Sequence, residues 1–179
     1  MRIITTLLFM FIYMMSLQNL QAQEEGTEKV VGAFGITLGQ IFNLEDVVDR
    51  EDDDGDNYWF APDNPYDDFI FYSVARTPIT GVVAMITAYS EKMTKNQCEV
   101  KRRTLKSILY RKYPYGWDAR DDDYNKYTVY GRDPSYVKVN CEGFGVYRLV
   151  ADYYDLDIRR ILKDERTKLD IDAASKDGL

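Results

Sequence analysis

Residues 69–90 read FIFYSVARTPITGVVAMITAYS and contain the two clearest strand patterns in the sequence. The first segment, 69–76, is apolar on both faces, which is typical of a strand in the interior of a sheet. TPITG then indicates a turn, and 82–90 is a second run rich in apolar and β-branched residues. We therefore expect an antiparallel pair of central strands.

Four further segments have strand patterns. GAFGITLG at 32–39 predicts a short strand that ends at Gly39. YTVY, SYVKVNC and VYRLVADYY predict three more, at 127–130, 135–141 and 146–154. The tetrapeptides GRDP and EGFG that separate these three are typical of tight turns. Hairpins rather than crossovers therefore join neighbouring strands, which favours an antiparallel sheet.

Two internal segments predict helices. Residues 40–48, QIFNLEDVV, place apolar side chains at mostly helical spacing. Thr94 and Gln97 form a capping-box pair that begins a longer helix, which Pro114 ends. Cys98 belongs to the apolar face of that helix and is expected to point at the core.

The C-terminal segment has an amphipathic pattern that predicts a third helix, capped by Asp155 or Asp157. The predicted order is strand, helix, two or three strands, helix, three strands, helix. This order predicts an α+β fold, with a single antiparallel sheet of five to six strands and two or three helices packed mainly on one face.

The first 22 residues have the pattern of a signal peptide. Arg2 supplies positive charge, residues 3–17 form an apolar run that is short for a membrane span, and Ala22 is a small residue before the expected cleavage site at Gln23. The alternative is a retained membrane anchor. We expect a signal peptide (1–22), a flexible lead-in (23–31), one α+β domain (32–173) and a C-terminal tail (174–179), in a periplasmic or secreted protein.

The only two cysteines, Cys98 and Cys141, fit such a location. An oxidising compartment would join them in a disulfide. The loop-entropy model assigns a bond of this span about 4 kcal/mol of stabilisation. The alternative, a reactive thiol, would need a basic partner near the sulfur. We predict the Cys98–Cys141 disulfide.

Charge is distributed unevenly along a chain of net charge −7. Residues 45–68 contain eleven acidic residues and a single basic one, Arg50, whereas residues 91–112 contain eight basic residues and two acidic ones. These two segments could face each other in the fold. An acidic chain repels phosphate, so nucleic acid is not an expected partner.

Part of the acidic segment, DDDGDNYWFAPD at 52–63, is similar to an EF-hand calcium loop. The candidate ligands stand at positions 1, 3, 5, 7 and 12 of such a loop: Asp52, Asp54, Asp56, Tyr58 (through its carbonyl) and Asp63. Asn57 occupies the usual glycine position, and two prolines would prevent a regular exiting helix. The alternative is a hydrated acidic turn. A second acidic loop, 117–127, fits calcium less well.

The segment that follows the middle helix, YRKYPYGW at 110–117, is rich in tyrosine. Exposed Tyr and Trp side chains stack on sugar rings or anchor protein interfaces, because they bring a large contact area at low entropy cost. The predicted partner-binding residues, for a protein or an envelope glycan, are Tyr113, Tyr115, Trp117 and Tyr124. The alternative is that these rings cover the core and the sheet edge.

The sequence contains no histidine, which excludes His-based triads, HExxH zinc hydrolases and imidazole acid–base catalysis. Neither a GxSxG motif nor a phosphate-binding glycine loop is present. The remaining enzymatic hypothesis is a carboxylate-dependent glycan hydrolase, which needs two suitably spaced acids. Thirty acidic residues offer no way to choose that pair.

The segments GAFGITLGQIF (32–42), FYSVARTPIT (71–80) and NQCEV (96–100) resemble small exported bacterial proteins of uncharacterised function. The resemblance implies an exported one-domain protein and no activity. We predict an exported, non-enzymatic binding or inhibitor-like accessory protein without a cofactor. The alternatives are a calcium-stabilised extracellular module that uses loop 52–63, and the carboxylate-dependent glycan hydrolase.

Overall fold

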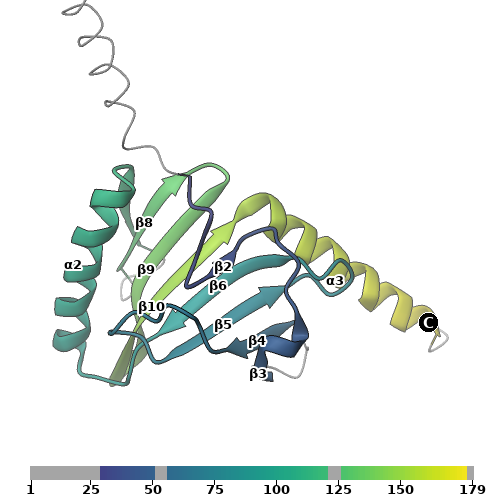
Figure 1. Cartoon of the computed structure of the whole chain (residues 1–179), viewed down its shortest axis with the longest axis horizontal. Helices are drawn as coiled ribbons and strands as arrows, with labels where there is room; N and C mark the ends of the chain where they lie inside the picture. Colours follow the sequence, from purple (N-terminus) through teal and green to yellow (C-terminus); the bar gives the residue numbers. More distant parts are fainter. Residues whose placement is uncertain (1–28, 51–55, 121–125, 177–179) are drawn as a thin grey trace, which may run out of the picture.

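The structure, a computed structural model, describes residues 29–50, 56–120 and 126–176, so the predicted signal peptide and its cleavage site lie outside the described residues. Its main element is an antiparallel sheet of eight strands in the order β3-β4-β5-β6-β10-β9-β8-β7 (Figure 1). These strands are β3 (Val47–Arg50), β4 (Asn57–Phe60), β5 (Phe71–Arg76), β6 (Val83–Tyr89), β7 (Gly116–Arg120), β8 (Lys126–Arg132), β9 (Ser135–Phe144) and β10 (Val146–Asp155). A separate two-stranded sheet, β1 (Gly32–Ala33) with β2 (Ile36–Thr37), precedes them.

The predicted fold class is wrong in strand number and in helix arrangement. In place of one sheet of five to six strands, the described chain has an eight-stranded sheet and a two-stranded sheet, with only two α-helices, so the fold is mostly β. The predicted strands do not include β3, β4 and β7, which are only four or five residues long. Short strands of this kind are specified by pairing to an existing neighbour more than by their own residue pattern.

The predicted central strands are confirmed. Residues 71–76 and 83–89 form β5 and β6, which pair in antiparallel register inside the sheet. The three C-terminal strands are also present, as β8, β9 and β10. The long β9–β10 hairpin pairs ten residues on each side, from Phe144 with Val146 to Ser135 with Asp155.

The N-terminal segment differs from the prediction. The expected strand at 32–39 is a tight β1–β2 hairpin, in which Phe34 and Gly35 turn the chain with φ of 55° and 87°. The expected helix at 40–48 is wrong, because only Leu44–Asp46 form a 3-10 turn before β3 begins. The Phe42 N–H donates to the carbonyl of Gly81, and the Phe42 ring is buried in the core. Pairing with the chain next to β6 thus overrides the helical spacing.

Helix α2 (Lys95–Lys112) begins with the predicted capping box, in which Thr94 and Gln97 satisfy each other's backbone N–H. Its buried residues are Cys98, Arg102, Leu105 and Leu109. A disulfide joins Cys98 to Cys141 on β9, which confirms the predicted bond. The Cα atoms of the pair are 6.0 Å apart, as a disulfide requires. The bond fixes α2 on one face of the sheet.

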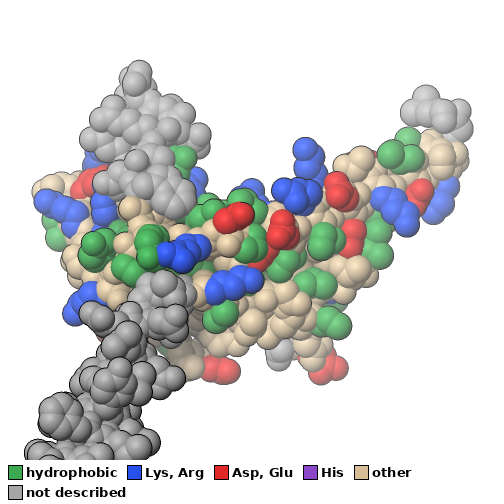
Figure 2. All heavy atoms as spheres, turned by 90° about the horizontal axis from the view of Figure 1, so that it is seen from above, with side chains coloured by type: hydrophobic (Ala, Val, Ile, Leu, Met, Phe, Trp, Pro, Cys, Tyr) green, Lys and Arg blue, Asp and Glu red, His purple; other side chains and the backbone are tan. Residues whose placement is uncertain are grey.

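Helix α3 (Leu156–Lys176) is capped by Asp155, whose carboxylate accepts from the N–H groups of Asp157 and Ile158. It crosses the ends of β10, β6 and β5 and then projects from the body of the molecule (Figure 1). None of its residues is buried. Figure 2 shows basic, acidic and hydrophobic side chains interspersed along this arm. Along the described chain, neither α2 nor α3 is long and apolar enough to cross a bilayer.

The two faces of the eight-stranded sheet are therefore covered differently. Helix α2 and the N-terminal segment pack against the face that carries Ile86 on β6 and Leu149 on β10. We call this the covered face, and it forms the core of the molecule. Side chains alternate between the two faces along each strand, so their sequence neighbours define the opposite, open face.

Candidate functional site

The open face carries polar and aromatic side chains, although it belongs to the same strands as the core. By register it includes Trp59, Phe71, Ser73, Thr87, Tyr89, Tyr136, Lys138, Asn140, Arg148, Asp152 and Tyr154. The small residues Ser73 and Thr87 are buried beneath larger neighbours, whereas the aromatic rings are half-buried or exposed. A face with this composition is suited to contact a ligand.

A groove of about 720 Å³ opens at the end of the open face where β4 and β5 meet the loop before β5. This volume lies in the range of ordinary ligand sites. Its walls are mostly apolar and aromatic, and the residues that matter here are Trp59, Pro62, Pro65, Ile70, Phe71 and Arg148. Trp59 packs edge-on against Phe71, with ring centroids 5.9 Å apart. Phe71 and Ile70 remain 44% and 46% exposed.

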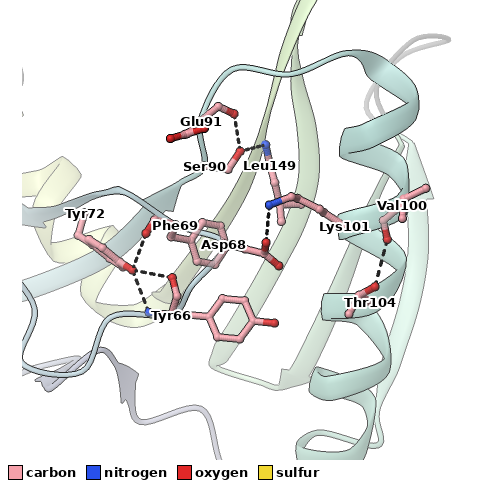
Figure 3. Close-up of polar contacts among 10 residues, drawn as sticks. All are labelled: Tyr66, Asp68, Phe69, Tyr72, Ser90, Glu91, Val100, Lys101, Thr104 and Leu149. Atoms are coloured by element: carbon pink, nitrogen blue, oxygen red, sulfur yellow. Dashed lines mark hydrogen bonds and ion pairs between the residues drawn. The ribbon is translucent and has the colours of Figure 1, made fainter.

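The loop that forms one wall of the groove is held in place from two sides (Figure 3). The buried Tyr72 hydroxyl lies 3.2 Å from the Tyr66 carbonyl and 3.1 Å from the Phe69 carbonyl, and accepts from the Tyr66 N–H at 3.0 Å. On the outer side, Lys101 of α2 forms an ion pair with Asp68. The groove wall is therefore attached to both the core and α2, which reduces the entropy cost of binding.

Arg148 is the cation of this groove. Its guanidinium lies over the Phe71 ring at 5.5 Å from the centroid, in cation–π geometry. Its Nε is buried, and no described residue accepts a hydrogen bond from it. A buried donor without an acceptor costs about 1–3 kcal/mol. A ligand carboxylate in the groove could pair with the Arg148 guanidinium, and a small rotation of that side chain would let the buried Nε donate to it as well.

The tip of the β9–β10 hairpin projects from the same end of the sheet. Phe144 is 99% exposed, and Val146, two residues from Arg148 on β10, is 52% exposed. Gly143 has a φ of 135°, and a Cβ there would lie 2.1 Å from the Val146 carbonyl oxygen, so only glycine fits. The sequence thus builds a tight tip that holds a large apolar side chain in solvent.

The middle of the open face is polar. Thr87 donates to Asp152 Oδ1 at 2.9 Å, and Asp152 lies between Thr87 on β6 and Lys138 on β9 in the register. Burial raises the pKa of the Asp152 carboxyl to about 6, and the negative charge of Glu142 adds to the shift. The Thr87 hydrogen bond and the charges of Lys138 and Arg159 act in the opposite direction.

The predicted calcium ligands do not come together in the described chain. Asp52 and Asp54 lie outside the described residues. Asp56 is buried and forms an ion pair with Arg166 of α3 at 2.5 Å, and Tyr58 belongs to a strand that pairs on both sides. Across the described residues, no group of three or more His, Cys, Asp or Glu is placed to hold a metal ion. The calcium loop stays a prediction.

The predicted partner-binding residues differ in how far they are exposed to solvent. Tyr113 is 3% exposed and belongs to the core beside α2. Tyr115 is 47% exposed, and the Arg132 guanidinium lies over its ring at 3.8 Å. Trp117 lies on β7, and Tyr124 falls outside the described residues. This segment lies at the β7 edge of the sheet, and its role in binding stays a prediction.

No sequence motif predicted the groove residues Trp59, Phe71 and Arg148. They come from three strands that are distant in sequence, and only the register brings them together. The one local signal was the alternation of apolar and polar residues in β9 and β10, which separates a core face from a polar face. No protein family model matches this chain, and no curated protein or solved structure shows significant similarity to it.

Proposed function

We propose that this protein is an exported, non-enzymatic binding protein that holds an extended segment of a partner protein in the groove. The partner would place an apolar side chain against Trp59 and Phe71, and a carboxylate against Arg148. The observation that carries this proposal is the buried Arg148 Nε, which lacks an acceptor among the described residues at the edge of an apolar groove.

The composition around the groove supports a protein as the partner. Trp, Tyr and Arg dominate the binding energy of protein interfaces, particularly where apolar residues surround them. Phe144 and Val146 extend the apolar surface beyond the groove. Together with Ile70 and Phe71, they make one end of the sheet unusually apolar for an exposed surface.

The cysteines support export, because a disulfide such as Cys98–Cys141 persists in oxidising compartments. The absence of histidine from the sequence supports a binding role over general acid–base catalysis. The ion pairs Asp56–Arg166 and Asp68–Lys101 also support this view of the acidic segment. Part of its charge stabilises the fold, so a calcium ion is not needed to explain it.

A peptide selection tests the proposal. The disulfide-bonded chain from Gln23 is panned against a random library displayed with free carboxyl termini. The expected result is enrichment of sequences that combine an apolar or aromatic residue with an adjacent carboxylate. Binding of one enriched peptide is then measured by fluorescence anisotropy. Arg148→Met and Phe71→Ser should each weaken binding at least about tenfold, which corresponds to about 1.4 kcal/mol.

Arg132→Met provides the matched control, because Arg132 also lies over an aromatic ring but near the β7 edge of the sheet. It should leave peptide binding unchanged. The proposal fails if no carboxylate-containing sequence is enriched. It also fails if the enriched peptides bind Arg148→Met and Arg132→Met equally well.

A further inference from the structure

A second site lies in the middle of the open face, away from the groove. Its floor is the cross-strand row Ser73–Thr87–Asp152–Lys138, which spans β5, β6, β10 and β9. At adjacent-strand spacings of about 4.8 Å, this row is roughly 14 Å long. None of its members lines the apolar groove.

Two side chains in this region, Asn140 and Asp152, each have one oxygen without a hydrogen-bond donor among the described residues. Asn140 is 4% exposed, and its Nδ2 donates to Glu142 at 2.8 Å, but no described residue donates to its Oδ1. Asp152 accepts from Thr87 through Oδ1 alone among the described residues. Asn140 pairs with Val150, so Asp152 is its diagonal neighbour on the same face, at about 7 Å. A ligand that offers donors could reach the half-buried Asp152 directly, and Asn140 Oδ1 after a small movement of the side chains that cover it.

Aromatic rings flank these acceptors. Tyr136 and Tyr154 are cross-strand partners whose ring centroids are 5.8 Å apart, with a tilt of 38° between the rings. Lys138 lies over the Tyr127 ring, and Arg159 lies over the Tyr154 ring. Half-buried tyrosines beside polar groups present flat apolar faces that suit the C–H faces of a sugar ring.

The charges favour a neutral ligand. A net charge of −7 disfavours polyanions, and at the site itself the acids Asp152 and Glu142 are matched by the bases Lys138 and Arg159. A metal ion is a poor fit, because the described residues contain no cluster of three potential ligands of the His, Cys, Asp or Glu type. A polyhydroxylated molecule supplies many donors without charge.

We propose that this part of the open face binds a neutral glycan. Sugar hydroxyls donate to Asp152 and to Asn140 Oδ1, and one sugar ring stacks on the Tyr136–Tyr154 pair. The inference is independent of the peptide groove, because none of the residues that carry it lines that groove.

Isothermal titration calorimetry with the disulfide-bonded chain tests this site. The probes are neutral hexasaccharides of β-1,4-glucose, α-1,4-glucose, N-acetylglucosamine and xylose. At least one should bind with Kd below about 1 mM. Asp152→Asn and Tyr154→Ala should each weaken that binding at least tenfold. Tyr115→Ala, which removes an exposed tyrosine near the β7 edge, should not change it.

Two further measurements distinguish this site from the groove, and loss of binding from misfolding of a variant. Arg148→Met should retain glycan binding while losing peptide binding, so failure of one proposal is separable from failure of the other. Saturation-transfer NMR on the unaltered protein should place the sugar protons near tyrosine rings, whether or not a variant folds. Absence of binding by all four oligosaccharides at millimolar concentration would overturn the inference. Binding that both Asp152→Asn and Tyr154→Ala leave unchanged would also overturn it.

Discussion

The two faces of the eight-stranded sheet are built by the same strands but have different compositions. On β9, Val137, Val139 and Cys141 lie on the covered face and are buried, whereas Lys138 and Asn140 point to the open face. The covered face packs against α2, which a disulfide joins to β9, whereas the open face has a groove at one end and a polar row in its middle. Because a strand alternates its side chains, stability and recognition can be changed separately on one backbone.

Removal of the disulfide should give the largest effect, because it connects α2 to the covered face. Replacement of both cysteines, Cys98→Ala with Cys141→Ala, should lower the free energy of unfolding by about 4 kcal/mol. Urea denaturation followed by circular dichroism measures this loss. Reduction of the unaltered protein should produce a loss of similar size. An unchanged midpoint in both experiments would show that α2 is held by packing alone.

Adjacent residues on β6 test the contrast between the faces directly. Ile86 is fully buried on the covered face, and Met85 is half-buried on the open face. Ile86→Ala should cost about 3 kcal/mol, because it removes apolar contacts and leaves a cavity. Met85→Ala should cost about 1 kcal/mol, because solvent already reaches the side chain. Equal costs in urea denaturation would mean that the open face is packed as a core.

The elements that could be predicted from sequence are those with a strong local pattern. Such patterns mark the β5–β6 pair, the α2 capping box, the Asp155 cap of α3 and the C-terminal strands β8, β9 and β10. β4 and β7 have no such pattern, because their stability comes from pairing with a neighbour. The segment 40–48 has a helical pattern but does not form an α-helix, because its backbone hydrogen-bonds to the chain beside β6.

The candidate sites were less predictable than the fold, because they depend on strand register. Asn140 and Asp152 are twelve positions apart in sequence and become neighbours only through the β9–β10 hairpin. Trp59 on β4 and Arg148 on β10 both lie against the Phe71 ring, although two other strands separate β4 from β10 in the sheet. Sequence patterns draw attention to concentrated charge, as at 52–63, yet two acids of the 45–68 segment, Asp56 and Asp68, form ion pairs with helices.

Asp152, on the open face, should make the free energy of unfolding depend on pH, which the apolar residues of the covered face do not. Its pKa of about 6 exceeds its usual value, so the folded state holds its proton more tightly than the unfolded chain. This group therefore lowers stability as pH rises from about 4 to 6. Asp152→Asn removes the effect, and should be more stable than the unaltered protein by about 2 kcal/mol at pH 7, after allowance for partial exposure. At pH 3.5 the two proteins should be equally stable.

Thermal or urea denaturation at several pH values measures this difference. Thr87→Val serves as a control, because it removes the hydrogen bond to Asp152 and leaves the charge in place. It should destabilise the protein more at pH 7 than at pH 3.5. A gap between Asp152→Asn and the unaltered protein that stays constant over pH 3.5–7 would show that Asp152 is well hydrated in the folded state.

Helix α3 belongs to neither face, and its attachment should contribute least. Glu165 accepts from Thr80 Oγ1 at 2.8 Å and from the N–H groups of Ile79 and Thr80. Burial alone would raise the pKa of Glu165, but these hydrogen bonds together bring it below its usual value. The stabilisation is therefore present above the unfolded-state pKa, near 4.5, and is lost as pH falls through the folded-state value.

Glu165→Gln should cost about 0.5 kcal/mol at pH 7, because the contact is partly solvated and the amide can still accept one hydrogen bond. The cost should shrink as pH falls below about 4.5, the unfolded-state value. Asp164→Asn, on the exposed side of the same turn, is the matched control and should have no measurable effect. Hydrogen exchange of the α3 amides provides the more sensitive measurement, because the helix has no buried residue to hold it once Glu165 is altered. Protection that stays unchanged in Glu165→Gln would mean that the Asp155 cap and the Arg166–Asp56 pair suffice to attach α3.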